Sequence, residues 1–151
     1  MSLKDWADNH WLRAHQSDPE EIEGLLSIVD RALRDAAKRD ISSDWRFGIA
    51  YNAALKLCTT LIHASGYRPE KTLQHYRTIA ALPFVLGKER DGDAAYLEAC
   101  RTKRNMAEYD MAGVATDADA DELLRFAAEL REEVIAWLKK NHPRLVSGRE
   151  A

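Results

Sequence analysis

The chain has 151 residues, of which 46% are apolar and 31% are charged, and its formal net charge at pH 7 is −3. This length and composition suit one folded domain with a hydrophobic core and argue against global disorder. The slightly acidic balance excludes a uniformly basic surface. Any contact with nucleic acid must therefore come from a local basic patch.

The cysteines and the hydropathy exclude further classes of protein. Cys58 and Cys100 stand far apart, without a CxxC pair or a Cys/His cluster, which argues against a disulfide scaffold and a structural zinc site. No stretch approaches about 18 uncharged apolar residues, and the first residues lack the apolar core of a signal peptide. We therefore expect a soluble, cytoplasmic protein with no membrane segment.

The chain begins with a predicted short helix or arm over residues 3–14, followed by a long helix. Asp18 can cap this second helix, with Pro19 at its first position and two glutamates in its first turn. An aspartate cap accepts hydrogen bonds from the free N–H groups of the first turn, proline needs no N–H partner there, and the glutamates interact favourably with the positive end of the helix dipole. Apolar residues then recur at a spacing of three and four, which predicts one buried face.

The third predicted helix begins at Ser42 or Ser43 and runs to about Ser65. Gly66 follows it and can take the left-handed conformation that ends many helices. The segment is apolar almost all round, whereas a surface helix has one apolar stripe. We therefore expect it to be the central and most buried helix.

Two more helices are predicted before residue 113. One starts near Pro69 and is ended or kinked by Pro83, because proline lacks an N–H group and clashes with the preceding turn. Residues 87–92 are expected to form a charged loop. Asp93 can then cap a helix that ends by Gly113.

The last predicted helix has an acidic start at residues 117–121 and is stopped by Pro143. No window shows sustained alternation of polar and apolar residues. The sequence therefore predicts an all-α, single-domain bundle of five or six helices with an up-and-down core. Residues 1–17 form its arm, residues 18–142 the bundle, and residues 143–151 a loose tail.

The histidines show no pattern typical of a metal site. They are His10, His15, His63, His75 and His142, and neither an HExxH nor an ExxH pair is present. We interpret them as scattered, solvent-facing residues and expect neither a metal ion nor a cofactor.

The segment from Arg101 to residue 110 is the strongest candidate for a site. Arg101 and Arg104 are three residues apart and should share a helix face, where two guanidinium groups can bind a phosphate. The alternative is a solvated face on which Arg104 pairs with Glu108. Tyr109 lies about 140° round the helix from Arg104. The two could meet across a dimer interface or where the helix frays, or Tyr109 could be a buried ring.

The order of segments resembles the HEPN domains, which are helical bundles of prokaryotic toxin–antitoxin and nucleotidyltransferase systems. The resemblance covers about residues 19–140. It is carried by DWRF at 44–47, AYNAAL at 50–55, ASGYR at 64–68, His75, and Arg104-Asn105 with Tyr109. Active members of that family carry an arginine, a polar residue, three variable positions and a histidine. Two protomers place both motifs in one cleft that cuts RNA without a metal ion.

Carried over to this chain, the resemblance puts Arg104 and Asn105 at the first two motif positions and Tyr109 at the histidine position. A phenol with a pKa near 10 is a poor base at pH 7, whereas an imidazole is a good one. His75 stands on another helix and could substitute only if the fold brought it to the motif.

Three functions follow from these residues. The favoured one is a non-catalytic, homodimeric module that binds RNA, a nucleotide or a partner protein through Arg101, Arg104, Asn105, Tyr109 and His75. The resemblance implies a nucleotidyltransferase or an antitoxin as the partner protein. The second is a ribonuclease toxin that tolerates Tyr109 and uses Arg104 to stabilise the anionic transition state. The third is a purely structural subunit.

Overall fold

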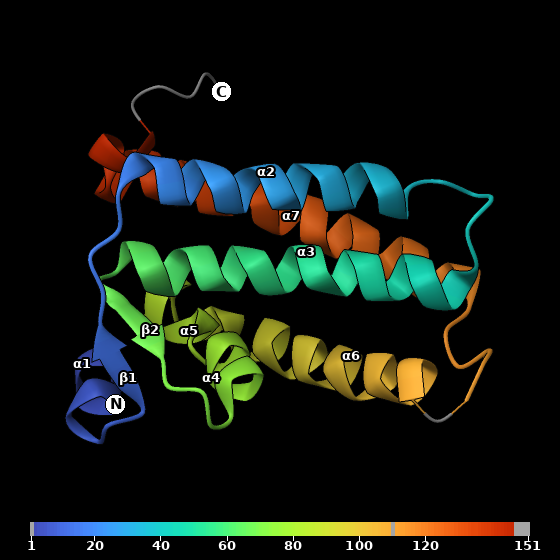
Figure 1. The fold of residues 1–151 in the computed structure, drawn as a ribbon, viewed down its shortest axis with the longest axis horizontal. Coiled ribbons are helices and arrows are strands. Elements are labelled where there is room, and N and C mark those ends of the chain that lie inside the picture. The colour runs from blue at the N-terminus through green and yellow to red at the C-terminus, as the bar shows by residue number, and fades with distance from the viewer. Residues whose placement is uncertain (1, 110, 147–151) are drawn as a thin grey trace.

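A computed structural model describes residues 2–109 and 111–146, and Figure 1 shows that its long helices run side by side. α2 (Pro19–Ala36), α3 (Ser43–Ala64) and α7 (Asp117–Asn141) make the most extensive contacts. α6 (Asp91–Tyr109) lies along the opposite side of α3 from α2 (Figure 1). The predicted all-α bundle is confirmed.

The starts of the first two long helices are those predicted. The Asp18 carboxylate accepts a hydrogen bond from the Glu21 N–H at 2.9 Å, and Pro19 is the first residue of α2. The Ser42 hydroxyl accepts from the N–H of Trp45 at the start of α3. These side chains satisfy N–H groups that have no partner inside a helix.

The predicted central position of α3 is confirmed by its burial and contacts. It packs against α2, α7 and α6, and its side chains are buried on almost every side. Its fully buried side chains include Tyr51, Leu57, Leu61 and Ile62. Gly66 follows the helix with φ of 97°, in the left-handed region that favours glycine.

A two-stranded antiparallel sheet was not predicted from the sequence. β1 (Leu12–Ala14) pairs with β2 (Tyr67–Pro69), with Leu12 opposite Pro69. Three residues per strand are too few to produce a detectable alternation of polar and apolar residues. The sheet and α1 (Leu3–Asp8) carry a second small core against the bundle, made by Leu3, Trp6, Leu12, Ile62 and Ala81.

Two predicted helix boundaries are wrong because the residues at those positions belong to other elements. Pro69 belongs to β2, so α4 begins later and spans Gln74–Ala80. α5 (Leu82–Leu86) carries Pro83 in its first turn, where proline is tolerated. The predicted loop at 87–92 is instead the 3₁₀ turn η1 (Lys88–Arg90) and the first turn of α6.

The predicted loose tail is also wrong for its first residues. Pro143 ends α7 as expected, but Pro143–Val146 form a 3₁₀ turn, η2, that packs on α2 and α7. Leu145 and Val146 are buried there. Residues 147–151 lie outside the described part of the chain. In the part that is described, no helix combines the length and the apolar character needed to cross a bilayer.

Candidate functional site

The two arginines of the predicted motif lie in the contact between α6 and α3. The side chains of Arg101 and Arg104 are 30% and 27% exposed, so both are mostly covered but reach solvent. The guanidinium carbon of Arg104 lies 5.7 Å from the centroid of the Tyr51 ring, at cation–π distance. The shared helix face predicted for the arginines therefore points toward α3.

Both arginines are paired with carboxylates on α6. Arg104 Nη2 lies 3.3 Å from Glu108 Oε2, and Arg104 Nη1 donates to Asn105 Oδ1 at 3.2 Å. Arg101 Nε donates to Glu98 at 3.0 Å. The Arg104–Glu108 pair expected as the alternative to a phosphate site is therefore present. Partly exposed pairs of this kind contribute about 0–1 kcal/mol, so an anionic ligand can replace the carboxylate at small cost.

Arg104 forms part of the wall of two neighbouring cavities, which we call together the Arg104 groove. Their volumes are about 320 and 300 Å³. Both are lined by Trp45 and Gly48 of α3 and by Arg104 and Glu108 of α6. A Cβ atom at position 48 would lie 3.9 Å from Cγ of Arg104, which is ordinary van der Waals contact, so a larger side chain there would occupy space in the groove.

Trp45 gives the Arg104 groove an aromatic wall. It is 62% exposed although it stands in the first turn of the most buried helix. The neighbouring Asp44 accepts hydrogen bonds from the N–H groups of Gly113 and Ala115, which fixes the loop before α7 beside the groove. Trp45 could not be recognised as a site residue from the sequence, because only the packing of α6 on α3 places Trp45 near Arg104.

The other two motif residues, Asn105 and Tyr109, differ in their burial. Asn105 is half-buried and contacts Arg104. Tyr109 is the last residue of α6 and is 75% exposed, so the alternative of a buried Tyr109 ring is wrong. α6 is helical from Arg104 to Tyr109, so ideal helix geometry separates the two residues of one chain by about 140° of rotation.

His75 is brought to the same side of the bundle as the arginines. It lies on α4, which packs against both α3 and α6. Burial lowers the pKa of His75, and the positive charges of Arg104, Arg101 and Lys56 lower it further. His75 therefore lies within the electrostatic field of the motif arginines and favours the neutral form at pH 7.

Tyr51 is a polar group beside Arg104 on the helix that the sequence predicted only to be apolar almost all round. Its side chain is 1% exposed, and its hydroxyl has no hydrogen-bond partner among the described residues. Burial raises the pKa of Tyr51 despite the nearby charges of Arg101 and Arg104. The phenol is therefore neutral and supplies an aromatic face to Arg104.

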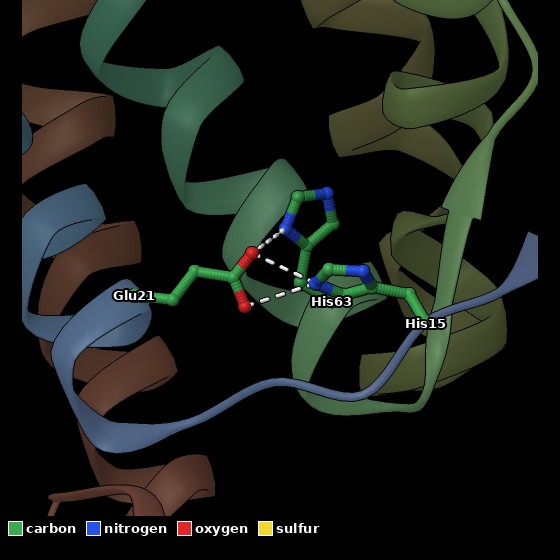
Figure 2. A group of neighbouring side chains, drawn as sticks. All are labelled: His15, Glu21 and His63. Atoms are coloured by element: carbon green, nitrogen blue, oxygen red, sulfur yellow. Dashed lines mark hydrogen bonds and ion pairs between the residues drawn. The ribbon is translucent and has the colours of Figure 1, made fainter.

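The interpretation of all the histidines as scattered and solvent-facing is wrong for His15 and His63. Their ring centroids lie 4.7 Å apart, and both rings face the Glu21 carboxylate (Figure 2). Their side chains are only 18% and 11% exposed. Burial lowers the pKa of His63, and this effect outweighs the attraction of Glu21. The cluster could not be predicted from the sequence, because His15 and His63 are 48 residues apart and the three residues come from three segments.

Comparison of the chain with protein-family models, with curated proteins and with solved structures found no match. The resemblance to HEPN domains therefore rests on the segments named above and stays a prediction.

Proposed function

We propose that this chain is a non-catalytic RNA-binding module that holds single-stranded RNA in the Arg104 groove. The observation that carries the proposal is the position of Arg104, half-buried between two cavities and beside the exposed ring of Trp45. A cation next to an exposed aromatic ring provides the two contacts that single-stranded nucleic acid needs, one for phosphate and one for a base.

The phosphate contact is assigned to Arg104 and Arg101. Guanidinium groups bind phosphate through two parallel hydrogen bonds. Arg101 now donates to Glu98, and Arg104 forms an ion pair with Glu108, and both carboxylates are partly exposed. A phosphate that takes the place of Glu108 keeps Arg104 paired. Because the chain as a whole is slightly acidic, this local pair of arginines is the source of attraction for RNA.

The base contact is assigned to Trp45, with Asn105 as a hydrogen-bonding group. Stacking of a base on an aromatic side chain contributes about 1–3 kcal/mol and tolerates any base. Cavities of about 300 Å³ each lie at the lower end of the usual range for small ligands, which suits single nucleotides better than a duplex. We therefore expect affinity for single strands with little sequence preference.

The resemblance to HEPN domains implies a homodimer, and the exposed residues at the end of α6 support one. Met106, Tyr109 and Met111 are 39%, 75% and 58% exposed. Large apolar side chains with this exposure are typical of interface cores. A dimer through this end places Tyr109 of one protomer near Arg104 of its partner. Sedimentation at micromolar concentration should give twice the chain mass of 17.1 kDa, and Met106→Glu should give the monomer.

The binding test uses a short single-stranded RNA of mixed sequence, titrated against the full chain. The Arg101→Ala, Arg104→Ala double variant should bind at least tenfold more weakly, and Trp45→Ala should also weaken binding. The matched control is the Arg125→Ala, Lys140→Ala double variant, which also removes two positive charges, from exposed positions on α7. Unchanged affinity in the double variant would refute the RNA proposal and favour a protein partner, such as an antitoxin or a nucleotidyltransferase.

A metal-independent ribonuclease is the second candidate, and one observation favours it. The pKa of His75 is lowered by burial, by Arg104 and by Arg101, so its imidazole is available as a proton acceptor near the arginines.

The two functions are separated by incubating RNA with wild type, Arg104→Ala, His75→Gln and Tyr109→His in the presence of EDTA. We expect no cleavage by wild type, and cleavage by Tyr109→His if the remainder of the cleft is intact. Cleavage by wild type that is lost in both Arg104→Ala and His75→Gln would establish the ribonuclease instead.

A further inference from the structure

Two imidazole rings and one carboxylate converge where α2 begins and α3 ends. His15 follows β1, Glu21 lies in the first turn of α2, and His63 lies in the last turn of α3. His15 Nε2 lies 2.7 and 2.9 Å from the two Glu21 oxygens, and His63 Nδ1 lies 3.4 Å from Glu21 Oε1. Figure 2 shows that both rings direct a nitrogen at the same carboxylate.

From this cluster we infer a binding site for one divalent transition-metal ion, with Zn²⁺ as the ion that best fits the ligands. The three candidate ligand atoms all lie within 4.8 Å of one another. Around a zinc ion with bonds of about 2.0–2.1 Å, tetrahedral ligands are about 3.3 Å apart. Glu21 already lies 2.7 Å from His15 Nε2 and 3.4 Å from His63 Nδ1, and no pair of ligand atoms must shorten by more than about 1.5 Å to close around an ion.

The cluster contains a buried nitrogen that faces Glu21 Oε1 at 3.4 Å without forming a hydrogen bond. His63 is 9% exposed, and its Nδ1 has no hydrogen-bond partner within the described part of the chain. A buried polar atom without a partner costs free energy, so such atoms often mark a missing ligand. Because this nitrogen faces Glu21 Oε1, an ion between them would satisfy both atoms.

The backbone around the cluster is held in place without the metal. The N–H of His15 donates to the Gly66 carbonyl at 2.9 Å, which fixes His15 next to the end of α3. The Ser17 hydroxyl donates to the His63 carbonyl at 2.8 Å. Ligands that are fixed before binding lose little conformational entropy when the ion arrives.

The chemistry of the donors selects the class of ion. Mg²⁺ and Ca²⁺ prefer oxygen ligands, whereas two imidazole nitrogens with one carboxylate suit Zn²⁺, Co²⁺, Ni²⁺ and Fe²⁺. Three protein ligands leave at least one coordination position for water or another small ligand. This site is independent of the RNA proposal. His63 and Trp45 are 18 residues apart on α3, which corresponds to about 27 Å of helix.

The test is titration of the tag-free full chain with Co²⁺, followed by displacement with Zn²⁺. Wild type should bind one Co²⁺ per chain, with visible absorption bands of a four- or five-coordinate site that Zn²⁺ abolishes. The melting temperature should rise with Zn²⁺ and stay unchanged with the same concentration of Mg²⁺. A wild-type protein that binds neither Co²⁺ nor Zn²⁺ at up to millimolar concentration would overturn the inference.

Variants assign the binding to these ligands. His15→Gln and Glu21→Gln should each weaken Co²⁺ binding at least a hundredfold, and both substitutions lie at partly exposed positions, so that the fold is retained. The matched control is His10→Asn, since His10 is an exposed histidine with φ of 64°, which asparagine tolerates. Equal Co²⁺ binding by wild type, His15→Gln and Glu21→Gln would place the ion elsewhere on the surface.

Discussion

The guanidinium of Arg46 and the carboxylate of Asp121 lie 2.6 Å apart and join the start of α3 to the start of α7. The same guanidinium donates through Nε to the carbonyl of Ala36, the last residue of α2, at 2.8 Å. Arg46 is 1% exposed, so the charge is buried and fully paired at the junction of three helices. Trp45 stands next to it, and this junction therefore fixes one wall of the Arg104 groove.

Removal of Arg46 should be destabilising. Arg46→Ala leaves the Ala36 carbonyl without its donor and removes one of the two arginine partners of Asp121, and we expect a loss of about 1–3 kcal/mol in the free energy of unfolding by urea. Arg39→Ala is the matched control, because Arg39 contacts the same carboxylate from a side chain that is 68% exposed. That variant should lose less than about 1 kcal/mol. Equal losses in the two variants would show that the Arg46–Asp121 pair stabilises the fold no more than the exposed Arg39–Asp121 pair does.

The same pair makes stability depend on acid. The hydrogen bond from Arg46 lowers the pKa of Asp121 below its ordinary value of 3.8, and Arg39 adds to the effect. Because the folded-state pKa is the lower one, the stabilisation is complete above the unfolded value and is lost as the pH falls through the folded value. The urea midpoint of wild type should fall below about pH 4, and Asp121→Asn should show a smaller fall. Identical pH profiles would contradict this assignment.

Leu57 provides a test of the central position of α3. It is 0% exposed and belongs to the main core cluster. Leu57→Ala should cost about 2–5 kcal/mol, the range for a buried leucine that leaves a cavity. Leu73→Ala removes the same atoms from a side chain that is 58% exposed and should cost less than about 1 kcal/mol. A small cost at Leu57 would require a different arrangement of the helices.

The relation between His75 and the motif arginines can be measured by NMR titration. Burial is the main cause of the lowered His75 pKa, and Arg104 is the largest electrostatic one. Arg104→Ala should therefore raise the pKa of His75 toward its ordinary value, while Arg125→Ala should leave it unchanged. The His75 signal is assigned by its absence in His75→Gln. A His75 pKa that does not respond to Arg104→Ala would place the imidazole outside the field of the motif.

Local features of the fold could be predicted from the sequence because they depend on neighbours along the chain. Asp18 and Pro19 mark the start of α2, and Ser42 marks the start of α3, since each acts on groups a few residues away. The β1–β2 pairing could not be predicted in this way. Its strands are 53 residues apart, from Ala14 to Tyr67, and three residues of strand carry no periodic signal.

The sequence by itself determined the helical class, the central place of α3 and the shared face of Arg101 and Arg104. These properties follow from helical periodicity and from the nearly continuous apolar perimeter of one segment. Only the tertiary structure decided what those residues contact. The packing of α6 on α3 placed Trp45 beside Arg104, the packing of α4 on α3 and α6 placed His75 in the field of Arg104, and the start of α2 beside the end of α3 brought Glu21 to His15 and His63. A functional cluster requires proximity in space, and side chains from separate elements acquire it only when the core closes.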